Sequence, residues 1–273
     1  MQSTNCRGEE VSKIQGKCVV ITGASGGIGR EIARRSASLG AKVVLLARNY
    51  DALLELKEEL IKEYGTEAYA YQLDVGDSGK VGEVFREIYE HAGEIDVLVN
   101  NAGYGVFKEA DETDMQETEA MFRVNVFGLM AATQMVLPGM KRRQSGHIIN
   151  IASQAGKMAT PKSSLYSSTK FAVLGYSNAL RMELKRDHVF VTTVNPGPIQ
   201  TNFFNIADES GSYTKNIEKF MLNPKDVAEK VVGSMFTGKR EINLPGWMNA
   251  ASRLHNLFPK TVETLGKRAF FKK

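Results

Sequence analysis

Short apolar runs alternate with segments of helical periodicity along almost the whole chain. Runs rich in β-branched residues predict strands, whereas apolar residues that recur every three to four positions predict helices. Asn223 and Pro224 are a typical N-cap and first-turn residue, and they mark the start of the last predicted helix. We expect strands at residues 17–22, 42–47, 67–73, 95–99, 146–151, 188–194 and 240–244, and helices at 27–39, 51–64, 77–92, 114–140, 164–186 and 224–236.

The predicted strands are apolar on both sides of their alternation, and helices connect them. Right-handed crossovers place such helices on both faces of a parallel sheet, which buries both sides of each strand. The predicted fold class is therefore α/β, a doubly wound parallel sheet of about seven strands in a single domain. No linker divides residues 17–245, which we separate from a polar leader at 1–16 and a basic extension at 246–273.

The composition of the 273 residues is that of an ordinary globular protein, with 42% hydrophobic and 24% charged residues. We see no apolar run near the roughly 18 residues that a membrane span needs. Cys6 and Cys18 cannot form a disulfide framework, and the N-terminus lacks an apolar signal region, so we expect a cytoplasmic location. The four histidines lie far apart without metal-ligand spacing, which predicts no metal site.

The net charge of +4 is concentrated at the C-terminal end. Residues 253–273 carry six basic side chains and one acidic one, whereas the other 252 residues carry 29 basic and 30 acidic ones. We interpret the basic segment first as a solvated tail and second as a contact with an anionic membrane surface. Nucleic-acid binding is not expected, because it would need a basic face across the fold.

A glycine-rich segment, TGASGGIG at 22–29, follows the first predicted strand and opens the first predicted helix. Gly23 permits the tight turn, Gly27 lets the backbone approach a pyrophosphate, and Gly29 allows close packing of helix on strand. The free N–H groups at the helix start attract the anion. In this context the segment, with Ser25 and Ile28, predicts the dinucleotide site of a Rossmann fold.

The same glycine-rich segment also contains the pattern G-x-S-x-G at 23–27, which is typical of the nucleophile elbow of a serine hydrolase. In a hydrolase the oxyanion loop follows an earlier strand. Only about 20 mostly polar residues precede this segment, so the chain has no place for that loop. We therefore favour nucleotide binding over hydrolysis.

The end of the second predicted strand indicates which nucleotide is bound. A carboxylate there accepts the ribose hydroxyls of NAD and repels the extra phosphate of NADP, but this position reads Leu46-Ala47-Arg48. Arg48 offers a fork of donors to a 2′-phosphate, although it could instead stack on the adenine or face water. NADP is thus the expected cofactor, with NAD second.

Tyr166 and Lys170 lie four residues apart in a helical segment, so their side chains project from one face. A phenol has a pKa near 10, and lowering that pKa by about 3 units requires roughly 4 kcal/mol of phenolate stabilisation. A nearby ammonium and a positive nicotinamide ring could supply it in a partly desolvated pocket. An isolated pair at this spacing would more often be a surface coincidence.

With these motifs, the chain resembles the short-chain dehydrogenase/reductase family in its single-domain form of about 250 residues. The likeness covers residues 17–245, and its motifs come in the family's order. They are TGASGGIG at 22–29, Asp74 in LDV, NNAG at 100–103, Asn125 in RVNVFG, Ser153 in NIASQAG, YSSTK at 166–170 and NPGPIQT at 195–201.

The resemblance implies a catalytic group in which Tyr166 is the general acid in carbonyl reduction and the base in alcohol oxidation. Ser153 would bind the substrate oxygen, Lys170 would lower the pKa of the tyrosine and hold the nicotinamide ribose, and Asn125 would hold a water linked to Lys170. Some NADP-preferring relatives carry a basic residue where this chain has Gly26, so the NADP preference depends on Arg48 alone. The resemblance also implies cofactor contacts by Asp74, Val75, Asn101, Ala102, Gly103, Pro196, Gly197, Ile199 and Thr201.

We therefore expect an oxidoreductase that transfers a hydride between NADP(H) and a small carbonyl or alcohol substrate. The alternative is an NADP(H)-binding sensor without turnover.

Residues 201–222 are longer than a typical connection and suggest a lid. Their aromatic residues, with Trp247 and Met248, either suit a hydrophobic substrate or only pack the lid onto the body. The family implies a homodimer or homotetramer through 114–140 and 164–186, and we favour contact with a partner subunit over a membrane for the C-terminal extension.

Overall fold

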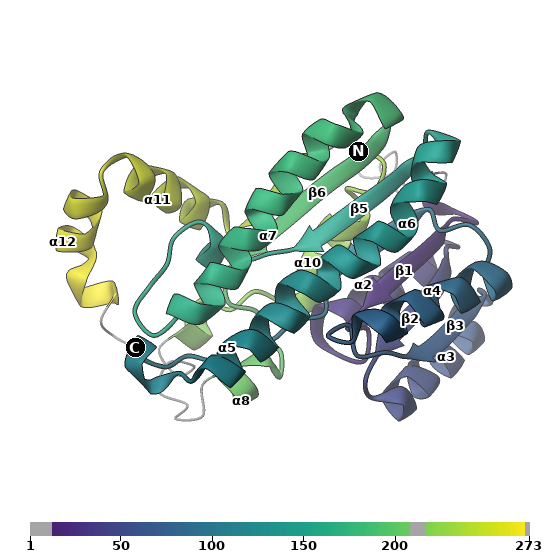
Figure 1. Cartoon of the computed structure of the whole chain (residues 1–273), viewed down its shortest axis with the longest axis horizontal. Coiled ribbons are helices and arrows are strands. Elements are labelled where there is room, and N and C mark those ends of the chain that lie inside the picture. The colour runs from purple at the N-terminus through teal and green to yellow at the C-terminus, as the bar shows by residue number, and fades with distance from the viewer. Residues whose placement is uncertain (1–12, 208–216, 271–273) are drawn as a thin grey trace, which may run out of the picture.

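A seven-stranded parallel sheet forms the centre of the protein (Figure 1). The computed structural model describes residues 13–207 and 217–270. The strand order is β3-β2-β1-β4-β5-β6-β7, which reverses direction between β1 and β4 and confirms the predicted doubly wound α/β fold. The strands span Cys18–Thr22 (β1), Lys42–Ala47 (β2), Ala68–Gln72 (β3), Val97–Asn100 (β4), Gly146–Ile151 (β5), Val189–Pro196 (β6) and Glu241–Leu244 (β7).

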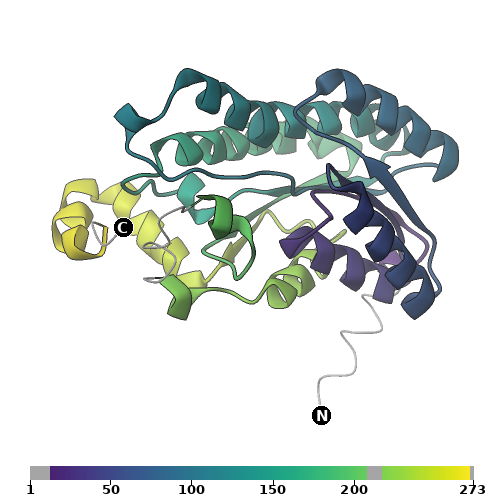
Figure 2. The ribbon, with the colours of Figure 1, turned by 90° about the horizontal axis from the view of Figure 1, so that it is seen from below.

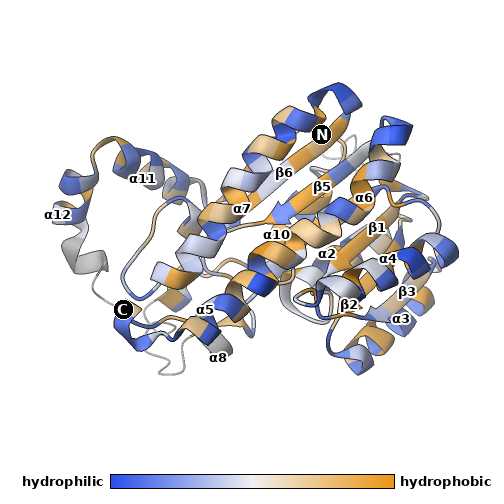
Figure 3. Ribbon diagram, viewed as in Figure 1, coloured by the Kyte–Doolittle hydropathy of each residue, from blue (hydrophilic) through white to orange (hydrophobic). Residues whose placement is uncertain are grey.

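Helices cover both faces of the sheet, as Figure 2 shows from the side. Val19 and Ile21 of β1 are buried among the helices of one face, and Val20 of the same strand is buried among those of the other. Burial on both sides explains why the strands are mostly apolar, with some polar residues in β5 and β6 (Figure 3). One layer contains α2 (Gly27–Ser38), α3 (Tyr50–Tyr64) and α10 (Pro224–Val232), and the other contains α4 (Ser78–His91), α6 (Leu129–Arg143) and α7 (Ser164–Glu183).

The helix predicted at 114–140 is wound differently in its middle and ends later than expected. It consists of α5 (Met115–Phe122), a π-helical stretch η2 (Arg123–Gly128) and α6. Such π-helical turns are rare and often occur at functional sites. The stretch contains the predicted site residue Asn125.

The combined helix Met115–Arg143 is long and apolar enough to cross a membrane by length and composition. The sequence analysis, which looked for a continuous apolar run, did not indicate this helix, because polar residues such as Arg123, Asn125 and Gln134 interrupt it. Of that window, 44% is buried inside the fold, and α6 packs on α4 and on the central strands. Packing in the core therefore accounts for part of its apolar character, and the exposed Met115 and Phe127 are not explained by it.

The remaining elements are short or lie near the C-terminus. The structure places α8 (Phe203–Ala207) and η5 (Glu218–Phe220) in the predicted lid, whereas 208–216 lie outside the described residues. The C-terminal extension forms two helices, α11 (Gly246–Leu257) and α12 (Pro259–Phe270), at one end of the molecule (Figures 1 and 2). Three further short helices are η1 (Ala110–Glu112), η3 (Gln154–Gly156) and η4 (Leu184–Asp187), the last of which continues α7.

Candidate active site

The predicted site residues gather at the carboxyl edge of the parallel sheet, where ligands of open α/β sheets bind. Each group follows the end of a strand or lies on a helix packed beside that edge. The glycine-rich loop follows β1, Arg48 follows β2, Asp74 and Val75 follow β3, Asn101, Ala102 and Gly103 follow β4, Ser153 follows β5, Pro196, Gly197, Ile199 and Thr201 end or follow β6, Asn125 lies in η2, and Tyr166 and Lys170 lie in α7.

The glycine-rich loop has backbone conformations and close contacts that require glycine. Gly23 has φ of +67°, and a Cβ atom there would lie 2.9 Å from the Cα of Ala102. Gly27 has φ of +54° and faces Thr201, whose Cγ2 would lie 3.3 Å from such a Cβ. The loop therefore packs closely against the segments that follow β4 and β6.

The start of α2 suits a bound anion. Its N-cap is Gly26, no side chain caps it, and its first turn carries no acidic residue. The first backbone N–H groups of a helix have no partner within the helix, and the helix dipole favours negative charge there. The site thus fits the pyrophosphate of a dinucleotide cofactor.

Thr22 and Asn101 brace this loop against the end of β4. The Thr22 hydroxyl accepts hydrogen bonds from the N–H groups of Asn101 (2.9 Å) and Ala102 (3.0 Å). The Asn101 side chain in turn donates to the carbonyls of Thr22 (2.9 Å) and Gly23 (3.1 Å). The sequence did not single out Thr22, although its place as the last residue of β1 was a usable signal. Because both N–H groups are occupied, a ribose would have to contact other atoms of 101–102.

Arg48 and Asp74 lie on the exposed part of the site. The carbonyl of Arg48 accepts a hydrogen bond from the Gln72 side chain at 2.9 Å, which fixes the backbone and leaves the guanidinium exposed. The carboxylate of Asp74 accepts from the N–H of Gly76 at 2.9 Å and so shapes its own turn. Both positions are accessible to a nucleotide lying over the sheet edge.

Ser153 is held at the junction of β5, β6 and η3. Its hydroxyl accepts from the N–H of Ala155 at 3.0 Å as the N-cap of η3, and it lies 3.5 Å from the carbonyl oxygen of Pro196. The cap fixes the side chain beside the end of β6. The residue is therefore both a local cap and a member of the candidate site.

Tyr166 and Lys170 are both buried on one face of α7, with 8% and 6% of their surfaces exposed. The Lys170 ammonium donates to the carbonyl of Ile151 at 3.0 Å and lies 5.6 Å from the centroid of the Tyr166 ring. Burial lowers the pKa of Lys170 from 10.5 to about 8, because the charged form loses its solvation. The arrangement thus places a cation with a pKa near neutrality beside a phenol.

The Asn125 side chain connects the loop that follows β4 to helix α7. Its oxygen accepts from the N–H of Tyr104 at 3.0 Å, and its amide donates to the carbonyl of Tyr104 (2.8 Å) and to the Thr169 hydroxyl (3.1 Å). A Cβ on Gly103 would lie 2.9 Å from the Asn125 oxygen and 3.7 Å from the Lys170 nitrogen. Asn125 in the π-helical turn thus lies close to Lys170, with Thr169 as a partner that the sequence did not reveal.

Aromatic side chains form one wall beside Tyr166. The rings of Phe107 and Phe203 lie 5.9 and 5.7 Å from the Tyr166 ring, centroid to centroid, and Phe204 packs against both phenylalanines. The N–H of Phe107 donates to the carbonyl of Ala207 at 3.0 Å, which ties α8 to the strand-four loop. Phe203 and Phe204 are among the lid aromatics that we expected either to suit a hydrophobic substrate or to pack the lid onto the body, whereas no sequence pattern indicated Phe107.

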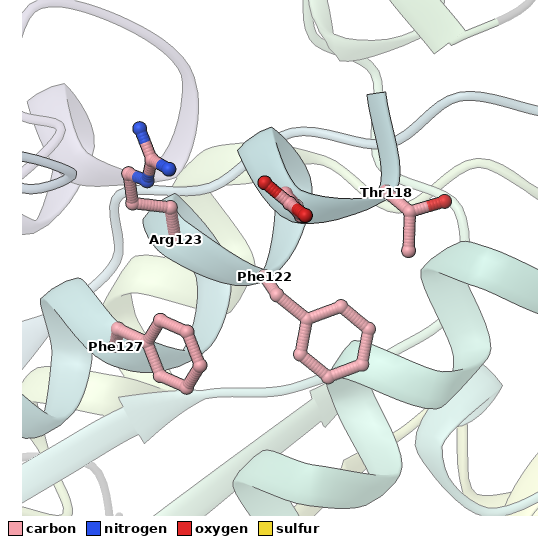
Figure 4. Close-up of a pocket in the computed structure, with 5 residues that line it drawn as sticks. Thr118, Phe122, Arg123 and Phe127 are labelled. Atoms are coloured by element: carbon pink, nitrogen blue, oxygen red, sulfur yellow. The ribbon is translucent and has the colours of Figure 1, made fainter. Parts of the chain in front are cut away.

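A separate hollow of about 290 Å³ lies on the outer side of α5 and η2 (Figure 4). Its neighbour Asn125 is 1% exposed, whereas Phe127, which lines the hollow, is 59% exposed. The two side chains therefore leave the helix on opposite sides, and the hollow is distinct from the candidate active site. It is lined by Thr118, Glu119, Phe122, Arg123 and Phe127.

Comparison with known proteins decides the family. The family model described as short chain dehydrogenase matches residues 17–210. The chain belongs to the short-chain dehydrogenase/reductase family. It is 38% identical over 220 residues to an uncharacterised oxidoreductase of Staphylococcus saprophyticus, an alignment that covers 81% of this chain and 91% of that protein.

Solved structures of this family agree with the fold and the cofactor class. An alcohol dehydrogenase from Thermococcus sibiricus, complexed with 5-hydroxy-NADP, superposes with a TM-score of 0.76 at 31% identity, covering 84% of this chain and 95% of its own. A family member from Burkholderia phymatum in complex with NAD superposes with a TM-score of 0.84 at 25% identity, covering 91% and 96%. The protein is thus an oxidoreductase of this family that uses NAD(P)(H).

Proposed function

We propose that this family member transfers a hydride between NADP(H) and a carbonyl or alcohol substrate, with Tyr166 as the general acid and base. The observation that carries the proposal is the buried Lys170 ammonium 5.6 Å from the Tyr166 ring. A phenol serves as an acid or base near neutral pH only if its phenolate is stabilised, and a buried cation beside it does this.

The proton and charge movements follow from these side chains. A bound nicotinamide supplies or accepts the hydride at the substrate carbon. In reduction the substrate oxygen gains negative charge, and the Tyr166 phenol donates its proton to that oxygen while Ser153 donates a hydrogen bond. The resulting phenolate is stabilised by the Lys170 ammonium. In oxidation the phenolate accepts the alcohol proton, and the same contacts stabilise the reverse step.

Lys170 also completes the proton path in this proposal. With a pKa lowered to about 8, its ammonium can return a proton to the phenolate at little free-energy cost. Asn125 fixes the loop that closes over the lysine, and its oxygen has a second lone pair that could hold a water leading to solvent. Asn125 therefore acts through Lys170 rather than on the substrate.

Arg48 supports NADP over NAD. Its exposed guanidinium follows β2, where a carboxylate would select NAD, and no acid occupies 46–48. A guanidinium can form paired charge-assisted hydrogen bonds with a 2′-phosphate.

The aromatic wall of Phe107 and Phe203 beside Tyr166 favours a substrate with an apolar group next to its carbonyl.

The helices α5, α6 and α7 support a homodimer or homotetramer. Phe127 of η2 and Phe171 of α7 are large apolar side chains that are about half exposed on two helices in contact with each other. Exposed apolar side chains gathered over neighbouring helices are typical of a subunit interface. The hollow in Figure 4 lies on the same surface and would receive side chains of a second subunit.

The alternative function is a nucleotide sensor without turnover. A binding protein has no need of the Ser153, Tyr166 and Lys170 group, which this chain retains in one place. A panel of aldehydes and ketones with NADPH separates the two functions. Sustained NADPH consumption supports the enzyme, whereas tight NADPH binding without turnover across the panel supports the sensor.

Replacing Tyr166 with Phe tests the acid and base directly. We expect turnover to fall by about two to four orders of magnitude while NADPH affinity is retained, because only the transferable proton is removed. Tyr64→Phe, a change in α3 on the other face of the sheet, is the matched control. Retained turnover in Tyr166→Phe would refute the assignment.

A further inference from the structure

The C-terminal helices α11 and α12 present an apolar surface that no described element covers. The side of α11 that faces the body is fixed by Ser252, which is 2% exposed, and by Met248, whose sulfur borders Gly197. Lys157, next to η3, also reaches this side and lies 3.0 Å from the Asn249 side-chain oxygen. The opposite side of α11 faces away from the sheet.

That outer side carries large apolar residues at helical spacing. Trp247, Leu254 and Phe258 lie seven and four residues apart, which places them on one side of the helix, and each is more than half exposed. Leu257 borders them at 72% exposure, and the Phe220 ring lies 6.5 Å from the Trp247 ring. Single exposed apolar residues are ordinary, but a contiguous group marks a contact surface.

The apolar surface continues onto α12. Leu265 is 82% exposed and lies three residues after Val262, on the same side of α12. The two helices are held together by the contact between His255 and Glu263, at 3.2 Å. We call the exposed apolar group Phe220, Trp247, Leu254, Leu257, Phe258 and Leu265 the C-terminal apolar surface.

Positive charges flank this surface. Arg253 and Lys260 are exposed on α11 and α12, and the sequence carries four more basic residues after Gly266. The acid in 253–273 is Glu263, which already contacts His255. Apolar side chains bordered by Lys and Arg are the signature of a helix that lies in a membrane interface and attracts anionic headgroups.

We propose that α11 and α12 form a peripheral docking surface for a bilayer with anionic lipids. The charge pattern favours lipid over a second copy of the chain. A symmetric contact through this surface would bring the basic side chains of two subunits together, and like charges at an interface are unfavourable. A lipid surface instead supplies opposite charge and accepts the apolar residues.

Docking would also place the candidate active site near the lipid. Met248 lies on the docking helix and borders Gly197, which follows the end of β6 beside Ser153 and Pro196. A carbonyl substrate dissolved in the membrane would then reach the site along α11. This consequence rests on the proposed function, whereas docking itself does not.

Trp247 is the only tryptophan of the chain, so its fluorescence reports on this surface alone. The full-length protein is mixed with vesicles of phosphatidylcholine, with or without phosphatidylglycerol. We expect a blue shift of the emission and quenching by brominated lipid with the anionic vesicles, both weakening as salt rises. No shift and no co-sedimentation with either vesicle would overturn the proposal, as would a concentration-dependent blue shift without vesicles, which would indicate a second copy.

Variants locate the contact. Leu257→Asp with Leu265→Asp, and separately Arg253→Glu with Lys260→Glu, should each weaken binding to anionic vesicles by about tenfold or more. The matched control is Ile61→Asp with Lys62→Glu, an exposed apolar and basic pair on α3. NADPH binding should stay unchanged in every variant, which shows that the fold is intact. Equal vesicle binding by the C-terminal variants and the control would contradict the assignment even if the enzyme is active.

Discussion

The Lys170 ammonium lies 5.6 Å from the centroid of the Tyr166 ring, and the lysine follows the tyrosine by one turn of α7. Neither side chain has much access to water, since their exposed fractions are 6% and 8%. Burying a cation beside a neutral phenol costs free energy in the protein without cofactor. The same cost makes the cation an effective partner for the phenolate once the phenol has given up its proton.

The Lys170 burial predicts a pH dependence of stability. Its pKa is about 8 in the folded protein and 10.5 in the unfolded chain, so the unfolded chain binds more protons between these values. Burial of the charged lysine therefore destabilises the folded protein fully below pH 8, and this destabilisation disappears as pH rises to 10.5. Relative to Lys170→Met, the free energy of unfolding of the parent should rise by up to about 3 kcal/mol over this window.

Denaturant unfolding of both proteins at several pH values, without cofactor, measures this difference. Lys62→Met removes an exposed lysine of α3 and is the matched control. The difference in the free energy of unfolding between Lys62→Met and the parent should stay constant over the same pH window. A Lys170→Met difference that is also independent of pH would show that the lysine titrates normally.

Arg48→Glu should change cofactor selection. It replaces a donor that suits the 2′-phosphate with a carboxylate that repels it and accepts ribose hydroxyls. We expect the Kd of NADPH to rise by about 10- to 100-fold and the Kd of NADH to change little or fall. Titration with both nucleotides measures this, with Arg86→Glu of α4 as the control. Equal effects on both nucleotides would refute the phosphate contact.

Phe203→Ala should weaken the binding of bulky apolar carbonyl substrates. The Phe203 ring packs 5.7 Å from the Tyr166 ring, so removing it opens the aromatic wall beside the proposed acid. Loss of part of a buried aromatic contact predicts a rise in KM of about tenfold for substrates with an aromatic group, with a smaller change for short aldehydes. Phe190→Ala, at the other end of β6, is the control. A fall in kcat with unchanged KM would instead assign Phe203 to positioning Tyr166.

The sequence predicted the layout of the fold because each structural signal was local. All seven strands were predicted within two residues at either end, and the glycines at 23, 27 and 29 lie in the loop and the first turn of α2, where their pattern predicted them. The π-helical stretch was not predictable, since its sequence, RVNVFG, fits ordinary helical periodicity. In the structure this stretch holds Asn125 in contact with Tyr104 and Thr169, which are distant in the sequence.

Contacts between distant segments were also beyond the sequence. Phe107 reaches the site because its N–H is bound to the carbonyl of Ala207, one hundred positions away in the chain. Thr169 binds Asn125 across 44 positions, and neither residue type at either position suggests this pair. Such partners depend on how distant loops and helices pack at the sheet edge, which no periodicity encodes.

Asn125→Ala should destabilise the protein as well as impair turnover. The amide satisfies both the N–H and the carbonyl of Tyr104, and alanine leaves these partly buried groups without their partner. We expect a loss of about 2 kcal/mol in the free energy of unfolding. Asn178→Ala, an exposed change on α7, should cost much less. A loss of turnover without any loss in the free energy of unfolding would contradict the role of Asn125 in holding the loop at Tyr104.

His147 predicts sensitivity to acid. His147 of β5 is fully buried, its Nδ1 accepts from the N–H of Phe236 at 3.0 Å, and its Nε2 lies 2.9 Å from the Thr192 hydroxyl of β6. Protonation would place a second N–H against the Phe236 donor. Burial lowers the pKa of His147 from 6.5 to about 3, since a charge there would lose its solvation.

The sign of this effect follows from the two pKa values. In the unfolded chain His147 is protonated below pH 6.5, whereas in the folded protein it stays neutral down to about pH 3. The free energy of unfolding therefore falls as pH falls through this window, by up to about 1.4 kcal/mol per pH unit. His147→Asn keeps an acceptor for Phe236 but cannot be protonated, and its stability should fall less steeply between pH 6 and pH 4. His188→Asn is the control, because His188 is exposed and its positive φ suits asparagine. Parallel pH profiles for the parent and His147→Asn would show that the buried ring accepts its proton in the folded state.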